Sequence, residues 1–246
     1  MLVHAARVAL APLLYMQARR LRATALQLPE PHGPRDGTVG SGDVRLRLLV
    51  AGDSSAAGVG CRTQDEALAL PLARALSHRL GGAVQWQLLA AIGLTSEDLL
   101  HRLTNGDVHA ADVALVVVGV NDIAREVPLE RALRSRARIV AWLRQHAGVR
   151  HVFFPAAPEM DRFPALPQPL AWYAGQHSRR NNRAQARWAE RLTRDDVPVR
   201  HIAFDGVTSP ALMAEDGYHP APPLYARMVS FLADSIAHAT TEEERT

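Results

Sequence analysis

Short apolar stretches alternate with amphipathic stretches along most of the chain. Polar and apolar residues alternate over residues 44–50 and then give way to a run of small residues, the pattern of a strand that ends in a tight turn. Residues 113–118 form a continuous apolar run rich in β-branched side chains, which is typical of a central strand buried on both faces. Three more strands are predicted at residues 83–89, 149–154 and 199–204.

Helical periodicity fills the intervals between these strands. The pair Gly81-Gly82 stands where a helix would end, and Thr95 stands where the next would begin, as capping preferences require. Strands that alternate with helices predict an α/β fold: a parallel sheet of five strands, helices on both faces and right-handed crossovers. The helices are predicted at residues 64–80, 129–146, 170–193 and 222–238, with a short one from Thr95.

The two ends of the chain lie outside this alternation. Residues 29–43 are rich in proline and glycine, which predicts a linker. The linker would join an N-terminal helical segment, residues 1–28, to an α/β domain over residues 44–239. The charged residues 240–246 predict a frayed tail.

Residues 1–22 contain an apolar run, at positions 8–16, that Pro12 interrupts. The run is too short to cross a bilayer, which takes about 20 apolar residues. Two interpretations stay open: a helix packed against the domain, or a helix that lies on a membrane surface with arginines beside it. The expected location is cytoplasmic, with or without membrane contact, and an uncleaved signal in a periplasmic protein is a further alternative.

Composition narrows the function classes. A chain of 246 residues that is 48% hydrophobic suits one sizeable domain. The formal charge of +3 comes from arginine alone, because the chain contains no lysine, and the arginines are scattered among nearly as many acidic residues. No nucleic-acid partner is therefore expected. Cys61 is the only cysteine, so no intrachain disulfide is expected and Cys61 is interpreted as a small buried residue.

Ser54 follows the first predicted strand, in the sequence Gly52-Asp53-Ser54-Ser55. The crevice beyond the carboxyl ends of parallel strands is the usual ligand site of such a sheet. A serine hydroxyl becomes a nucleophile only with a base, a group that orients the base, and donors for the oxyanion. We interpret Ser54 as a candidate nucleophile and Asp53 as a brace for the turn that carries it.

His219 is the candidate base. It lies in a turn-forming stretch before the last predicted helix, three residues after Asp216, whose carboxylate can reach the imidazole from that spacing. Asp98 and His101 have the same spacing, but apolar periodicity places them inside a helix with a solvated polar face. The spacing alone therefore leaves a purely structural role open for Asp216 and His219.

Gly93 and Asn121 follow the second and third predicted strands. A glycine lets a backbone N–H approach a substrate closely, and a side-chain amide is a second kind of donor. Each residue alone is also explained as a turn residue, and Asp122 as a cap or turn residue. Because Ser54 and His219 also follow strands on the same side of the sheet, the four positions together favour one shared site.

Four sequence blocks resemble those of the SGNH hydrolases, also called the GDSL esterase and lipase superfamily. The resemblance extends from about Val44 to the last helix and implies a flavodoxin-like three-layer α/β/α sandwich. Ser55 stands where leucine gives the family its name, and Ala91 stands where the family often has an asparagine. The blocks are Gly52-Asp53-Ser54-Ser55, Gly93, Gly119-Val120-Asn121-Asp122 and Asp216-Gly217-Tyr218-His219-Pro220.

This resemblance implies a role for each of the candidate residues. Ser54 is the nucleophile, His219 the general base and Asp216 the residue that orients the base. The backbone N–H groups of Ser54 and Gly93 and the side-chain amide of Asn121 form the oxyanion hole. No motif indicates a metal or a nucleotide, so no cofactor is expected.

The sequence therefore predicts a serine esterase that acts on small-molecule esters with short to medium acyl chains, or on lysophospholipid-like substrates. An acyl or acetyl transferase and a carbohydrate deacetylase would use the same residues, and a non-catalytic lipid-binding protein is a third alternative. Apolar residues in or beside the proline-rich residues 155–169 are candidates for an acyl pocket, although a loop that only packs on the domain explains them equally well. These candidates are Phe163, Leu166, Trp172 and Tyr173.

Overall fold

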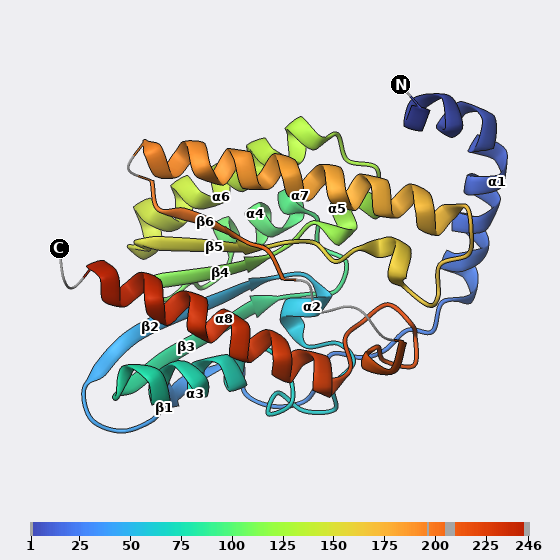
Figure 1. Cartoon of the computed structure of the whole chain (residues 1–246). Coiled ribbons are helices and arrows are strands. Elements are labelled where there is room, and N and C mark those ends of the chain that lie inside the picture. The colour runs from blue at the N-terminus through green and yellow to red at the C-terminus, as the bar shows by residue number, and fades with distance from the viewer. Residues whose placement is uncertain (1, 196, 205–209, 244–246) are drawn as a thin grey trace.

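A six-stranded sheet runs through the centre of the molecule (Figure 1). The computed structural model describes residues 2–195, 197–204 and 210–243, with side chains from residue 10 to residue 241 within these ranges. The strands are β1 (Asp36–Val39), β2 (Val44–Gly52), β3 (Ala83–Ala90), β4 (Val113–Val117), β5 (His151–Pro155) and β6 (Val199–Ile202). Their order in the sheet is β1-β3-β2-β4-β5-β6, and only the β1–β3 pair is antiparallel.

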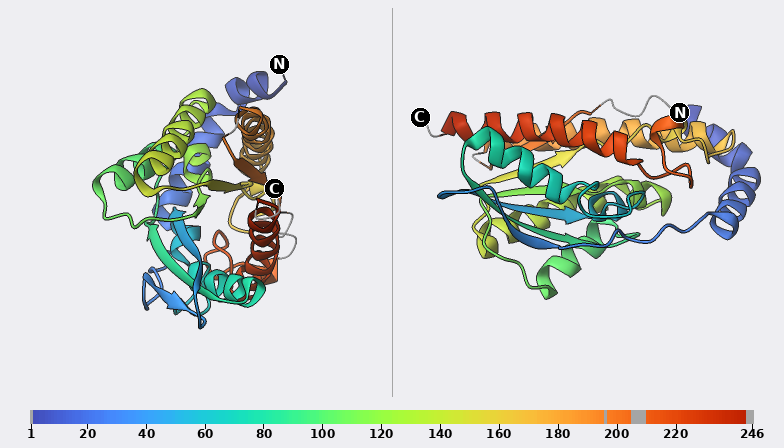
Figure 2. Two further views of the ribbon diagram at one scale, coloured as in Figure 1. Left: turned by 90° about the vertical axis from the view of Figure 1, so that its left-hand side faces the viewer. Right: turned by 90° about the horizontal axis from the view of Figure 1, so that it is seen from below.

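Helices cover both faces of this sheet. They are α1 (Leu2–Thr24), α2 (Ser54–Ala57), α3 (Ala69–Leu80), α4 (Ser96–Asn105), α5 (Val120–Ala124), α6 (Leu129–Ala147), α7 (Leu170–Arg194) and α8 (Pro222–Glu243), with 3-10 turns η1 (Met160–Arg162) and η2 (Pro210–Leu212). Helices α3 and α8 pack on one face, and α4, α6 and α7 pack on the other (Figures 1 and 2). The flavodoxin-like three-layer sandwich is therefore confirmed.

The central strand β2 shows why the sequence folds into three layers. Leu48 and Val50 belong to the apolar core under α3 and α8, whereas Leu49 and Ala51 belong to the core under α4, α6 and α7. Successive side chains of a strand point to opposite faces of the sheet, so a strand with apolar residues at every position must be covered on both sides. Strand β2 therefore contributes side chains to both apolar cores.

The segment expected to be a linker contributes a strand, which corrects the predicted strand count. Asp36 to Val39 pair with Val84 to Gln87 of β3 and form the antiparallel edge of the sheet. Three of the four residues of β1 are exposed, because an edge strand without a packed outer face needs no apolar alternation. The proline and glycine content of residues 29–43 therefore concealed a strand that carries no hydrophobic pattern.

Several predicted boundaries also shift. The helix expected over residues 64–80 begins at Ala69, because Gln64 turns inward and its amide donates to the carbonyl oxygen of Ala57 (3.0 Å). The last helix continues to Glu243, beyond the expected end at 238, so most of the expected frayed tail is helical. Residues 244–246 of that tail lie outside the described residues.

The strand order creates one crevice at the carboxyl ends of the strands. The chain passes from β2 to β3 on one side of β2, and later returns to β4 on the other side. The connections that leave β2 and β4 therefore diverge, and an α/β sheet binds its ligand at such a switch point. Ser54 follows β2 and Asn121 follows β4, so both residues flank this crevice.

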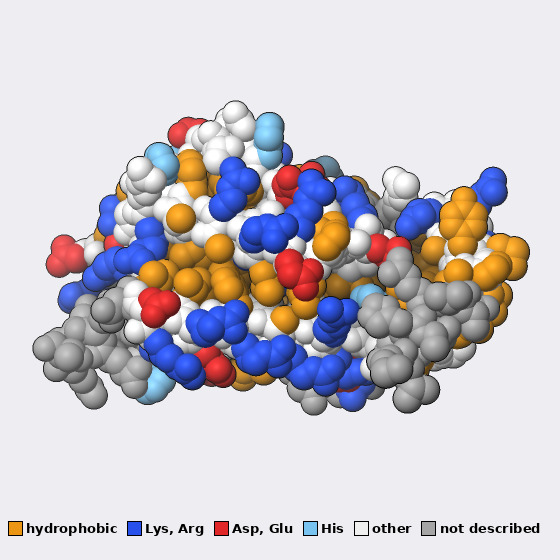
Figure 3. Space-filling view, turned by 90° about the horizontal axis from the view of Figure 1, so that it is seen from above, with side chains coloured by type: hydrophobic (Ala, Val, Ile, Leu, Met, Phe, Trp, Pro, Cys, Tyr) orange, Lys and Arg blue, Asp and Glu red, His pale blue; other side chains and the backbone are white. Residues whose placement is uncertain are grey.

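Helix α1 packs across one end of the sandwich (Figure 1). Its Leu14 is only 8% exposed, and the side chain of Gln17 bonds the start of α7 twice, by donating to the carbonyl oxygen of Gln168 (2.7 Å) and accepting from the N–H of Leu170 (3.2 Å). Hydrophobic side chains gather on the surface at this end, with basic side chains beside them (Figure 3). No helix among the described residues is long and apolar enough to span a membrane. Contact of residues 1–22 with a membrane surface stays a prediction.

Candidate active site

The turn after β2 holds Ser54 at the crevice. Asp53 is the N-cap of α2, and its carboxylate accepts a hydrogen bond from the N–H of Ser55 (3.0 Å), which agrees with its predicted bracing role. A side chain at Gly52 would come within 2.2 Å of the carbonyl oxygen of Val117. Glycine therefore allows β2 and β4 to approach each other where the serine emerges.

Ser54, His219 and Asp216 form a continuous hydrogen-bonded chain. The Nε2 atom of His219 lies 2.8 Å from Oγ of Ser54, and Nδ1 lies 2.5 Å from Oδ2 of Asp216. The other carboxylate oxygen of Asp216 accepts from the N–H groups of Tyr218 (2.9 Å) and His219 (3.0 Å). This is the geometry of a serine, histidine and aspartate triad, in which the carboxylate fixes the tautomer and orientation of the imidazole.

The carboxyl group of Asp216 is held in its ionised form. Burial alone would raise its pKa, but the hydrogen bonds from the His219 ring and from the N–H groups of His219 and Tyr218 outweigh burial and lower the pKa below its usual value. An ionised carboxylate at this position stabilises the positive charge that the imidazole acquires when it takes a proton.

The loop that carries His219 packs closely against the segment that follows Ser54. A side chain at Gly60 would come within 2.2 Å of the carbonyl oxygen of Pro220. On the same side, the hydroxyl of the fully buried Tyr225 donates to the carbonyl oxygens of Val59 (2.9 Å) and Ser55 (3.2 Å). Helix α8 therefore holds both loops at the separation that the Ser54–His219 hydrogen bond needs.

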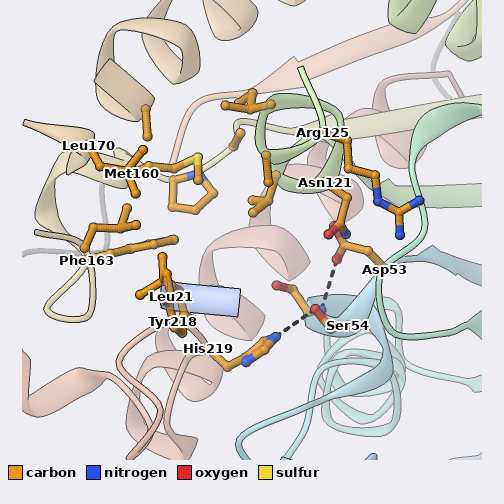
Figure 4. A pocket seen from close by; sticks show the side chains of 18 of the residues that line it. Leu21, Asp53, Ser54, Asn121, Arg125, Met160, Phe163, Leu170, Tyr218 and His219 are labelled. Carbon is orange, nitrogen blue, oxygen red and sulfur yellow. Dashed lines mark hydrogen bonds between the residues drawn. The ribbon is translucent and has the colours of Figure 1, made fainter. Parts of the chain in front are cut away.

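Asn121 and Arg125 lie on the same side of the pocket as Ser54 (Figure 4). The amide nitrogen of Asn121 donates one hydrogen to the carbonyl oxygen of Leu94 (3.1 Å). An amide nitrogen carries two hydrogens, so this bond orients the second one. The arrangement suits a donor for an oxyanion that forms above Ser54.

Gly93 follows β3, as expected. It adopts a left-handed conformation (φ +82°), and its carbonyl oxygen accepts from the guanidinium of Arg125 (2.8 Å). Arg125 lines the cavity next to Ser54, whereas Gly93 is not among the described residues that do so. The structure thus brings Ser54, Asn121, Asp216 and His219 together, and the oxyanion role of the Gly93 N–H stays a prediction.

The triad opens into an apolar cavity of about 620 Å³. Figure 4 shows the polar residues Ser54, Asn121, Arg125 and His219 on one side of it and Leu21, Met160, Phe163, Leu170 and Tyr218 on the other. Three of the four expected pocket residues, Phe163, Leu166 and Tyr173, are among its lining residues, and Trp172 is not. The expectation for Trp172 is wrong because it lies only one residue, about 100° around α7, from the inward-facing Tyr173.

Comparison with known proteins identifies the family. Residues 50–227 match the model of the GDSL-like lipase/acylhydrolase family. The chain belongs to the GDSL-like lipase/acylhydrolase family. A GDSL-like esterase of Mycobacterium tuberculosis is 29% identical over 202 residues, which cover 80% of this chain and 64% of that relative. The chain therefore spans less than two thirds of the length of this relative.

Solved structures of GDSL-like proteins and other esterases share the fold. A carbohydrate esterase family 2 enzyme of Corynascus thermopiles has a TM-score of 0.62 at 15% identity, with 82% of this chain and 69% of that chain covered. A lipase from a goat rumen metagenome has a TM-score of 0.59 at 18% identity (76% and 95% covered), and the esterase EstA of Pseudoalteromonas has 0.57 at 17% (79% and 98% covered). These likenesses show the fold alone.

Beside Asn121 in this GDSL-like chain lies a buried polar network that the sequence did not predict. Asp122, expected to be a cap or turn residue, is 2% exposed. Its carboxylate accepts from the N–H (2.9 Å) and hydroxyl (2.5 Å) of Ser96, and from the guanidinium of Arg136 (3.0 Å). Because Asp122 adjoins Asn121, the network fixes the start of α5 to α4 and α6.

Arg136 is the centre of this network, and it is fully buried. Burial lowers its pKa, and the charge and hydrogen bond of Asp122 act in the opposite direction. Its guanidinium also donates to the amide oxygens of Gln185 (2.5 Å) and Asn181 (3.1 Å) in α7. One signal could have revealed it: Arg136 lies four residues from Ala132 and thus on the apolar stripe of its helix.

No cluster of three histidine, cysteine, aspartate or glutamate side chains within residues 2–195, 197–204 and 210–243 is arranged to hold a metal ion. Cys61, expected to be a small buried residue, is 8% exposed and its thiol donates to the carbonyl oxygen of Glu66 (3.2 Å). Burial raises the pKa of this thiol to about 12, which keeps it protonated and poorly nucleophilic at neutral pH.

Proposed function

We propose that this protein is a serine esterase that hydrolyses carboxylic esters through an acyl-enzyme on Ser54. The observation that carries the proposal is the unbroken hydrogen-bonded chain from Asp216 through His219 to Ser54, which ends in an apolar cavity. The membership of the chain in the GDSL-like lipase/acylhydrolase family supports the same reaction class.

The reaction begins when an ester carbonyl settles between Ser54 and Asn121. Nε2 of His219 accepts the hydroxyl proton of Ser54 while Oγ attacks the carbonyl carbon. The carbonyl oxygen becomes an oxyanion and accepts hydrogen bonds from the free amide hydrogen of Asn121 and from the N–H of Ser54. Asp216 stabilises the imidazolium by its hydrogen bond to Nδ1.

Collapse of this intermediate breaks the bond between the carbonyl carbon and the alcohol oxygen. The imidazolium of His219 gives its proton to the departing alcohol, and the acyl group remains on Oγ of Ser54. Water then repeats the sequence: His219 takes its proton, its oxygen attacks the acyl carbon, and Ser54 leaves with the proton from His219. The products are a carboxylic acid and an alcohol, and the enzyme is regenerated.

Hydrolysis of p-nitrophenyl esters from acetate to palmitate tests this proposal. Ser54→Ala should reduce kcat by about 10⁵ to 10⁶-fold, because the nucleophile of a triad is lost. Ser235→Ala, a serine on the outer surface of α8, is the matched control and should retain activity. Circular dichroism confirms that each variant is folded.

Covalent labelling gives a second, independent readout. A fluorophosphonate should add to Oγ of Ser54 with loss of fluoride, and the mass increase should map to the peptide that contains Ser54. If the wild type hydrolyses no ester, or if Ser54→Ala is as active as the wild type, the esterase proposal fails. An added alcohol that captures the acyl group faster than water would instead indicate a transferase.

A further inference from the structure

Helix α1 supplies a wall of the cavity, although it lies before residue 50, where the match to the family model begins. The residues of α1 and its end that line the cavity recur every three or four positions, so they form one continuous stripe along the helix. The stripe is apolar except for Arg22, which lies towards its end. Its residues are Ala11, Leu14, Tyr15, Ala18, Leu21, Arg22 and Ala25.

The apolar lining continues beyond α1. Met160 and Phe163 of the proline-rich segment and Tyr173 of α7 face the cavity, and Leu224 and Met228 contribute from α8. Figure 4 shows Leu21 of α1 beside Phe163 and Tyr218, on the far side of the cavity from Asn121 and Arg125. A chain that leaves the reaction centre therefore enters a space that apolar side chains line.

Contacts with the domain hold this wall in place. The side chain of Gln17 forms both hydrogen bonds to the start of α7 that were described above, and Leu14 is buried between α1 and the domain. The start of α7 carries Leu170, which also lines the cavity. The position of α1 and the shape of the cavity are therefore coupled.

We propose that α1 completes an acyl-chain site and gives the enzyme its preference for esters with long acyl chains. The inference rests on the proposed esterase function and names its substrate class. A cavity of about 620 Å³ lies within the usual range for a site that encloses a small ligand. Each methylene group that the apolar wall removes from water strengthens binding roughly fourfold, so long acyl chains gain most from α1.

The test places a large side chain on the inner or the outer face of α1. Ala18 lines the cavity, whereas Ala23 is exposed and is not among the described lining residues. Ala18→Trp should fill the cavity and reduce kcat/KM for p-nitrophenyl laurate at least tenfold, while kcat/KM for the acetate changes less than twofold. The matched control Ala23→Trp should leave both values, and their ratio, at the level of the wild type.

A second variant changes the cavity in the opposite direction. Leu21→Ala enlarges it and should shift the preferred acyl chain to a longer ester without loss of acetate hydrolysis. If both variants keep the laurate-to-acetate ratio of the wild type, or if Ala18→Trp lowers the two activities equally, α1 does not determine acyl specificity and the proposal is overturned. Labelling of Ser54 by the fluorophosphonate shows that the reaction centre of each variant is intact.

Laurate binding distinguishes the failure of this inference from the failure of the esterase proposal. Calorimetric titration of the Ser54→Ala variant with sodium laurate needs no catalysis, and adding Ala18→Trp should weaken that binding at least tenfold. If the wild type is inert on every ester but laurate binding depends on Ala18, the cavity stands and the esterase proposal fails. If esters are hydrolysed but Ala18→Trp leaves the affinity for laurate unchanged, the acyl-site inference fails and the esterase proposal stands.

Discussion

The two sides of the cavity are built in different ways. On the reaction side, polar side chains that follow different strands are joined by hydrogen bonds of fixed geometry, such as the one of 2.8 Å between His219 and Ser54. On the acyl side, α1, the proline-rich segment and α8 present apolar side chains to the same space. The reaction side needs particular atoms at particular distances, whereas the acyl side needs only shape and the exclusion of water.

This difference explains why short motifs reveal one side and leave the other hidden. A triad fails when one atom is displaced, so its residue types and their spacing are restricted. An apolar wall accepts many side chains of similar volume. Substitutions that change the reaction side and its supports, and leave the acyl side intact, therefore separate the two sides.

The largest effect is expected from Asp216→Asn. The amide cannot stabilise the imidazolium and favours the wrong tautomer of His219, so kcat should fall by about 10⁴-fold. KM for long-chain esters should change little, because the acyl wall is untouched. The p-nitrophenyl ester series measures both values.

Asp98→Asn is the matched control for this change, because Asp98 stands at the same three-residue spacing from His101. Asp98 lies on α4, where it accepts from the N–H of Thr95 as part of a capping box. Its amide variant should keep kcat within about threefold of the wild type. If Asp98→Asn and Asp216→Asn were equally active, the hydrogen bond to His219 would have no role in catalysis.

The second largest effect is expected for protein stability, when the buried pair of Asp122 and Arg136 is broken. Arg136→Leu leaves the carboxylate of Asp122 buried without its cation, and breaking such a pair costs about 3 to 5 kcal/mol of unfolding free energy. Urea unfolding measures this loss. Arg138→Leu, at an exposed position of the same helix, is the control and should change the free energy by less than about 0.5 kcal/mol. Equal unfolding free energies of the two variants would show that the network around Asp122 and Arg136 does not stabilise the fold.

The sequence predicted the reaction side because topology does most of the assembly. Parallel strands end at one edge of the sheet, so Ser54, Asn121 and His219 could be placed near one another from their order after the strands. The antiparallel strand β1 escaped prediction because its exposed residues carry no apolar period. Its register depends on the edge of β3, which lies about 45 residues away in the sequence.

Tertiary contacts hid the remaining features. The pairing of Asp122 with Arg136 joins two helices, and the residues between them in sequence do not indicate it. The role of α1 depends on how that helix crosses the end of the sandwich, which no local pattern encodes. Trp172 shows the same limit on a smaller scale, because a neighbouring position on one helix decides whether a side chain reaches the cavity.

The smallest effect is expected at Asp53, the N-cap residue of the turn that carries Ser54. Burial, opposed by the N–H of Ser55 and assisted by the charge of Asp122, raises the pKa of Asp53 from 3.8 to about 7. Between these two pH values the folded protein binds a proton that the unfolded chain has released. The free energy of unfolding from this group therefore falls as pH rises from about 4 to 7 and is constant above that range.

Asp53→Asn removes this titration and keeps a residue type that caps helices well. Relative to the wild type, the variant should gain about 2 to 4 kcal/mol of unfolding free energy between pH 4 and pH 8. Urea unfolding at both pH values measures the difference, and titrations elsewhere in the protein cancel because both proteins contain them. If the difference between the two proteins did not change with pH, Asp53 would be ionised throughout. The turn that holds Ser54 would then carry a buried negative charge at every pH at which the enzyme works.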